Sequence, residues 1–86
     1  MARARKPAKS LRSPEHRALC ALLIAARRKA GLNQTKLAER LSKPQSFVAK
    51  YEGGERRLDI VEFLTVTRAI GADPRRILRD LIKKQL

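Results

Sequence analysis

Three polar residues, Gln45, Ser46 and Lys50, are expected to share one exposed face of a short helix. Phe47 and Val48 fall on the opposite, apolar face of the same helix, where they can pack against a core. Amide, hydroxyl and ammonium groups of these types form hydrogen bonds with the edges of base pairs in a DNA major groove. The pattern favours a helix that reads DNA bases, while a polar face that only meets solvent is the plainer interpretation.

A second short helix must precede this one and set its angle. Apolar residues at helical spacing predict it from about Gln34 to Leu41. Pro44 disfavours helical angles at the residue before it but suits a helix start, so the next helix runs from Pro44 or Gln45 to Glu52. Ala38 is small enough for the two helices to cross steeply over a three-residue turn. The spacing of residues 33–52 is that of a helix-turn-helix.

Helix-start and helix-stop signals predict three further helices, one before this pair and two after it. The first runs from 13 or 14 to about 30, the second from about 60 to 70, and the third from 74 to 85. The apolar positions at helical spacing in the first two are Leu19, Leu22, Leu23, Ala26, Ile60, Phe63, Leu64, Thr67 and Ile70. The chain is therefore predicted to be all-α. Five helices form one domain, residues 13–86, after a disordered basic arm, residues 1–12.

The charge of the chain points to a polyanionic partner. Its 86 residues hold 21 Lys and Arg against 8 Asp and Glu, which gives a net charge of +13. The excess is concentrated in residues 1–17 and 27–57, the N-terminal arm and the surroundings of the helix-turn-helix. Nucleic acid agrees with that distribution better than a membrane surface does. The arm could follow a DNA backbone, or it could only keep the chain soluble.

Other classes of function find little support in the sequence. Cys20, the only cysteine, lies in an apolar helical run and is expected to be buried. His16, the only histidine, has no cluster of ligands near it, so no metal or other cofactor is expected. No set of residues has catalytic spacing, and the chain is predicted not to be an enzyme. No apolar stretch is long enough to span a membrane and no export signal is recognised, so a cytoplasmic, nucleoid-associated protein is expected.

The last predicted helix, residues 74–85, is more apolar than a helix that only caps a small monomer needs to be. The residues concerned are Ile77, Leu78, Leu81 and Ile82. They predict contacts with a second copy of the chain, and the alternative is that all four close the core of the monomer.

The segment from about Leu23 to Leu78 resembles the lambda-repressor-like domain of the Cro/CI (XRE) helix-turn-helix regulators. The matching residues, in the family's order and spacing, are Leu23, Arg27, Gly31, Leu32, Asn33, Gln34, Leu37, Ala38, Val48, Tyr51, Glu52, Gly53, Leu64, Ala69, Ile70, Gly71, Asp73 and Pro74. The resemblance implies a five-helix, lambda-repressor-like bundle that binds double-stranded DNA. It also implies a bacterial or phage transcription regulator, a repressor that binds a near-palindromic operator as a homodimer.

The resemblance assigns a role to each residue of the site. The residues that would read base edges are Gln45, Ser46 and Lys50. Those that would contact the DNA backbone are Asn33, Gln34, Lys36, Lys43, Arg56, Arg57 and Arg27. Arg27 would also form a structural ion pair with Glu52, and Gln34 would brace the recognition helix.

Two residues depart from the family's pattern at the turn. Ser42 stands where Gly is usual, and a left-handed conformation there would strain it modestly. Pro44 replaces the usual Ser or Thr cap of the second helix. Both departures leave open the angle of that helix and which of its polar side chains reaches furthest.

The family's small members leave more than one role open. They include antitoxins and restriction–modification controller proteins, so a toxin or another protein is a second possible partner. RNA binding through the arm is disfavoured, because exposed aromatic residues that could stack on bases are scarce.

Overall fold

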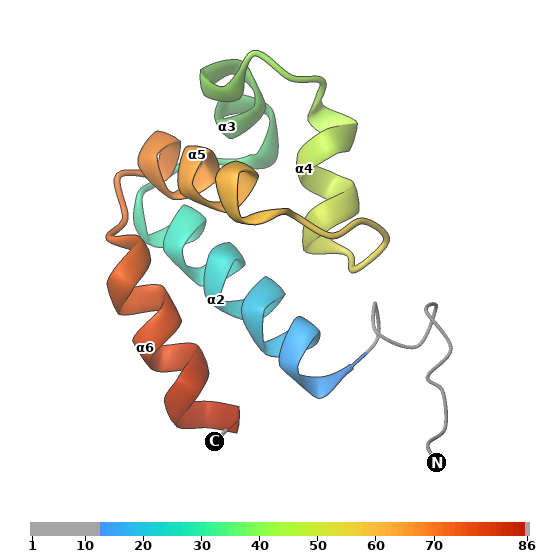
Figure 1. Ribbon diagram of the computed structural model, residues 1–86. Coiled ribbons are helices and arrows are strands. Elements are labelled where there is room, and N and C mark those ends of the chain that lie inside the picture. Colours follow the sequence, from blue (N-terminus) through green and yellow to red (C-terminus); the bar gives the residue numbers. More distant parts are fainter. Residues whose placement is uncertain (1–12, 86) are drawn as a thin grey trace.

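The computed structural model describes residues 13–85, which form five helices and no strand (Figure 1). The helices are α2 (Pro14–Lys29), α3 (Gln34–Leu41), α4 (Gln45–Glu52), α5 (Ile60–Ile70) and α6 (Pro74–Gln85). The all-α fold of five helices is confirmed, with bounds within about one residue of the expected ones. The predicted arm, residues 1–12, lies outside the described residues. Within residues 13–85 no helix is both long and apolar enough to cross a membrane.

Side chains cap three of the helices in the way that the sequence predicts. The Ser13 hydroxyl accepts from the His16 backbone N–H at 3.0 Å, and the side-chain oxygen Oδ1 of Asn33 accepts from the Lys36 backbone N–H at 2.8 Å. Asp59 and Glu62 form a reciprocal capping box at the start of α5. Each bond satisfies a backbone donor that a helix start leaves without an intrahelical partner, so helix bounds follow from local sequence.

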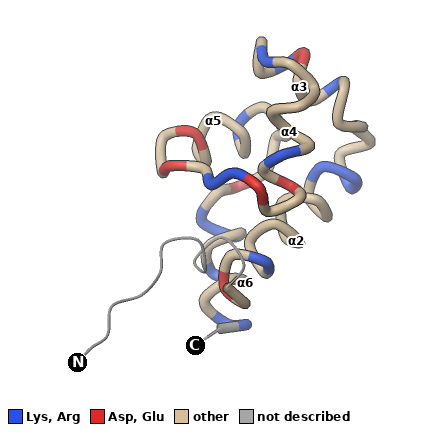
Figure 2. The backbone as a smooth tube through the Cα atoms, turned by 90° about the vertical axis from the view of Figure 1, so that its right-hand side faces the viewer, with Lys and Arg blue, Asp and Glu red and all other residues tan. Residues whose placement is uncertain are grey.

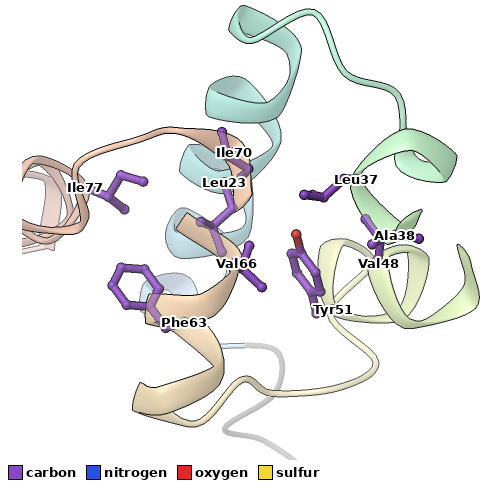
Figure 3. Close-up of a cluster of buried hydrophobic side chains, with 9 residues drawn as sticks. All are labelled: Leu23, Leu37, Ala38, Val48, Tyr51, Phe63, Val66, Ile70 and Ile77. Carbon is purple, nitrogen blue, oxygen red and sulfur yellow. The ribbon is translucent and has the colours of Figure 1, made fainter. Parts of the chain in front are cut away.

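The core lies where α2, α5 and the α3–α4 pair meet (Figure 3). The buried apolar residues are Leu23, Leu37, Ala38, Val48, Tyr51, Phe63, Val66, Ile70 and Ile77. Figure 3 shows the Tyr51 ring from α4 pointing at side chains from α2, α3 and α5, so the second helix of the motif is anchored through one large residue.

Three predictions about apolar residues need correction. Ile60 and Leu64 were expected on the apolar face of α5 but are 62% and 38% exposed, while Val66 is buried. The reason is that the buried face of α5 is centred on Phe63 and Ile70, and Ile60 and Leu64 lie at the flank of that face. Ile77, expected in the dimer interface, is 6% exposed and belongs to the core of the single chain.

The turn between α3 and α4 contains the strain that the sequence anticipates. Ser42 has φ 55° and ψ 42°, the left-handed conformation, and it is the one non-glycine residue with positive φ between residues 13 and 85. This conformation lets the Lys43 N–H donate to the Ala38 carbonyl at 3.0 Å, which closes α3. Pro44 then starts α4 without a side-chain cap.

Replacing the strained serine should stabilise the fold. Ser42→Gly is expected to raise the free energy of unfolding by about 0.5–1 kcal/mol, because relief of the Cβ clash exceeds the entropy cost of glycine. Thermal denaturation should show Tm higher by roughly 2–8 °C. The matched control is Ala21→Gly on the exposed side of α2, which should lower stability by about 1 kcal/mol. A lower Tm for Ser42→Gly would mean that the Ser42 side chain stabilises the turn.

A buried histidine should make the stability of the fold depend on pH. His16 is 9% exposed, and its Nε2 is buried with no hydrogen-bond partner among residues 13–85. Burial, and then the charge of Arg57, lower the pKa of His16 from its ordinary value of 6.5. Unfolding therefore takes up a proton between the lowered pKa and pH 6.5. Stability is intact above pH 6.5, declines as the pH falls from 6.5 toward the lowered pKa, and levels off below it.

Urea denaturation between pH 7 and pH 5 tests this dependence. The wild-type midpoint should fall over that range, and His16→Leu should reduce the fall. The comparison of the two proteins is needed because carboxylates begin to titrate at the acidic end. If the urea midpoint falls equally with pH in wild type and variant, another group causes the decline in stability.

Candidate nucleic-acid interface

The face of α4 that points away from the core carries the three predicted base-reading residues. Gln45, Ser46 and Lys50 are exposed, while Val48 and Tyr51 of the same helix are buried. Figure 1 shows α3 and α4 at one end of the molecule, away from α6. The helix is thus fixed through one side and leaves an amide, a hydroxyl and an ammonium group free to meet a partner.

A buried ion pair fixes α4 to α2. Arg27 Nε lies 2.7 Å from Glu52 Oε2, and its Nη2 lies 3.0 Å from Oε1. The third bond of the guanidinium runs from Nη1 to the Leu32 carbonyl at 2.9 Å. Bonding to Glu52 raises the pKa of Arg27 above its usual range. The ion pair expected between these residues is therefore present, and it ties α2, the loop before α3 and the end of α4 together.

The same geometry argues against the second role expected of Arg27. Its side chain is only 9% exposed and its guanidinium points inward, toward Glu52. A DNA phosphate could be reached only by breaking a buried bidentate pair, which is costly. This geometry favours a structural role for Arg27 over a phosphate contact.

The side chains of two glutamines form hydrogen bonds that lead from the ion pair to the protein surface. Gln34 Nε2 donates to Glu52 Oε1 at 2.9 Å, and Gln45 Nε2 donates to Gln34 Oε1 at 2.7 Å. The bracing role expected of Gln34 is therefore present. The direct bond between the two amides was not anticipated, because only the relative placement of α3 and α4 brings these residues together.

Basic side chains surround the exposed face of α4. Lys36 and Lys43 are exposed, at the start of α3 and in the turn. The Lys43 ammonium lies 5.4 Å from the centre of the Phe47 ring, and the Arg56 guanidinium lies 4.8 Å from it. Phe47 therefore holds two cations beside α4, a feature that the sequence signals only through the four-residue spacing of Lys43 and Phe47.

The loop after α4 is held by an acidic partner. Arg56 donates to both carboxylate oxygens of Glu62, at 2.7 and 3.0 Å, and to the Arg57 carbonyl at 2.7 Å. The Arg56 bonds, and then the Asp59 backbone N–H, lower the pKa of Glu62 from 4.5 to about 2. The guanidinium remains partly exposed, so Arg56 combines a structural contact with an accessible positive charge.

Positive charge is not confined to this end of the molecule. Figure 2 shows Lys and Arg spread over several elements, and α6 alone carries five of them. The exposed side chains of α4, rather than the overall charge, distinguish this face from the rest of the surface.

Comparisons with known proteins agree with this geometry. A helix-turn-helix family model matches residues 23–77. The structure of an XRE-family-like protein from Pseudomonas syringae pv. tomato str. DC3000 is 45% identical in sequence, with a TM-score of 0.82, and the match covers 91% of this chain and 95% of that one.

Two more distant structures share the fold. The restriction-modification controller protein C.AhdI from Aeromonas hydrophila is 26% identical, with a TM-score of 0.69 and coverage of 76% and 98%. The clp gene regulator ClgR from C. glutamicum is 22% identical, with a TM-score of 0.75 and coverage of 86% and 96%. Curated protein sequences contain no significant match. The chain belongs to the XRE-type helix-turn-helix family of DNA-binding transcription regulators.

Proposed function

We propose that the chain is a repressor that binds a specific, near-palindromic operator as a homodimer. The observation that carries this proposal is the face of α4, where Gln45, Ser46 and Lys50 are exposed while the Arg27–Glu52 pair fixes the helix from behind. A recognition helix reads bases only if its side chains enter the groove at a fixed angle, and a buried ion pair supplies that rigidity.

Each exposed residue of α4 has a distinct chemistry in the groove. Gln45 presents an amide that can bond an adenine through two atoms, and Ser46 presents a hydroxyl that is less selective. Lys50, one turn further on, reaches a guanine or a phosphate. Sequence preference is therefore assigned mainly to Gln45.

Phosphate contacts supply affinity on both sides of α4. The residues that we assign to the DNA backbone are Asn33, Gln34, Lys36, Lys43, Arg56 and Arg57. Backbone N–H groups at the start of α3 add to them, because a helix start favours a phosphate. Affinity should therefore decline steeply with salt concentration.

We assign the contact with a second copy of the chain to the outer side of α6. Leu78 and Ile82 are 36% and 54% exposed, and Leu81 is partly exposed, so three of the four residues expected there remain accessible. A two-fold dimer would place two recognition helices about 34 Å apart, in successive major grooves.

A restriction–modification controller is the second candidate role. The similarity to C.AhdI, a restriction-modification controller protein, supports it. Selection from a random duplex pool would supply the operator, and its location upstream of a restriction gene would favour this role. Co-purification of a toxin from the native host would instead favour the antitoxin role.

Removing the side-chain amide of Gln45 should change the DNA sequence preference of the protein. Gln45→Ala is expected to cost about 1–3 kcal/mol on the selected operator and to relax the preference at one base pair in each half-site. Lys36→Ala is the matched control on α3, because loss of a phosphate contact should weaken binding to all sequences alike and lower the salt slope by about one. An unchanged base preference in Gln45→Ala would remove this residue from the reading set.

A charge on the outer side of α6 should separate the dimer. Ile82→Glu is expected to shift sedimentation equilibrium toward the monomer and to weaken operator binding, since one half-site alone holds each copy less tightly. Val61→Glu is the matched control, because Val61 is 66% exposed on α5, outside the assigned interface. If Val61→Glu dissociates the dimer and Ile82→Glu does not, the interface lies on α5.

A further inference from the structure

We propose that α6 carries a second binding site for duplex DNA, on the side of the molecule opposite to the recognition helix. The site consists of four exposed cations that we call the basic stripe: Arg75, Arg76, Arg79 and Lys83. The protein can thereby hold two DNA segments at once, one on α4 and one on α6. This activity is separate from the proposed recognition of an operator, which assigns no DNA contact to α6.

The basic stripe follows from the helical spacing of α6. Arg75, Arg79 and Lys83 are four residues apart, so they succeed one another along one side of the helix, with Arg76 beside them. Ile77, which is 6% exposed, anchors the opposite side of α6 in the core. The row from residue 75 to residue 83 is about 12 Å long. The same length of duplex DNA carries about seven phosphate charges, so the stripe is long enough to meet several of them.

Most of the charge on the basic stripe is not neutralised within the described residues. Arg75 Nε lies 3.4 Å from Asp73 Oδ1, in an exposed pair, whereas the other three cations form no ion pair among residues 13–85. Like charges four residues apart on a helix repel one another, and cations in the first turn oppose the helix dipole. The first turn of α6 has no acidic residue to offset them. The basic stripe therefore weakens α6 unless a polyanion covers it.

The basic stripe and the recognition helix face away from each other. In Figure 1, α6 and α4 lie on opposite sides of the domain, and α2, which contacts both, lies between them. Figure 3 shows Ile77 of α6 and Val48 of α4 on opposite sides of the core, so the exposed faces of these two helices point in different directions. One straight duplex on α4 cannot also lie along the basic stripe, which is left for a second segment.

Duplex DNA fits the basic stripe better than other polyanions do. The sequence of α6 has no aromatic residue on which the bases of a single strand could stack. A membrane surface requires apolar side chains at the centre of the exposed face, and Arg79 occupies that place instead. A protein that is already held on DNA through α4 also meets neighbouring duplex at a high effective concentration. The second segment is therefore assigned to duplex DNA.

A bridging assay tests the second site. A biotinylated duplex of unrelated sequence is fixed on beads, and a fluorescent duplex that contains the selected operator is captured through the protein at near-physiological salt. The stripe variant carries Arg75→Gln, Arg79→Gln and Lys83→Gln together. Glutamine forms helices about as readily as arginine and lysine do, so α6 should be preserved.

The matched control removes the same charge outside the basic stripe. This scattered variant carries Arg28→Gln, Arg68→Gln and Lys84→Gln, at exposed positions on α2, α5 and the other side of α6. Relative to wild type, the stripe variant should capture at least about tenfold less labelled duplex and the scattered variant less than about twofold less, because only the former loses phosphate contacts. Both variants should bind the operator alone with equal affinity, since each has lost three charges.

Equal capture by the two variants would overturn the second site, because overall charge would then explain the bridge. A wild-type protein that binds the operator but captures no labelled duplex would overturn it as well. Unlabelled duplex should release the bridge. Faster release by single-stranded RNA or by phosphatidylglycerol vesicles, at equal phosphate concentration, would rule out duplex DNA as the partner of the stripe.

A labelled duplex of unrelated sequence separates this proposal from the proposed function. If wild type captures that duplex as well as it captures the operator, recognition of a specific operator is contradicted, while the second site stands. Capture of the operator duplex alone, lost in the stripe variant, supports both.

Discussion

The contact on which the recognition end of this molecule depends is the buried pair between Arg27 and Glu52. Each charge is nearly inaccessible to water, and either one without the other would cost about 3–5 kcal/mol. The pair joins the long helix α2 to the last residue of α4, and Arg27 also holds the Leu32 carbonyl before α3. The positions of both helices of the motif therefore depend on one charged cluster. This cluster, rather than apolar packing alone, fixes the orientation of α4 relative to the rest of the domain.

Several local features near that cluster lower the stability of the fold. Ser42 adopts a left-handed conformation, α4 begins at Pro44 without a side-chain cap, and the Tyr51 hydroxyl is buried with no partner among residues 13–85. Each costs on the order of 1–2 kcal/mol. All three lie in the turn or in α4. Because strain persists only where the surroundings over-determine the backbone, the buried pair and the core contacts of Tyr51 must hold α4 firmly enough to offset them.

The sequence predicted most of the fold because its helices carry their own boundaries. Ser13 and the Asp59 capping box act within one turn, so their effect does not depend on the rest of the structure. Ile60 and Ile77 were misassigned because helical spacing defines a face but not what covers it. The ion pair between Arg27 and Glu52 was expected from the resemblance to the XRE regulators. The bond from Gln45 to Gln34 spans the turn and depends on the crossing of two helices, which no local pattern encodes.

The distribution of charge separates affinity from selectivity in the proposed function. Basic residues occur on every described helix, so attraction to DNA is a property of the whole surface and would hold the chain to any duplex. Selection of a site has to come from the few groups whose direction is fixed. On the face of α4 the Gln45 amide, which we propose to read a base, is bonded to Gln34, whereas the Lys50 ammonium can rotate its donors freely. In the proposed function, the fixed direction of this amide, rather than the number of contacts, determines how much of the attraction becomes sequence preference.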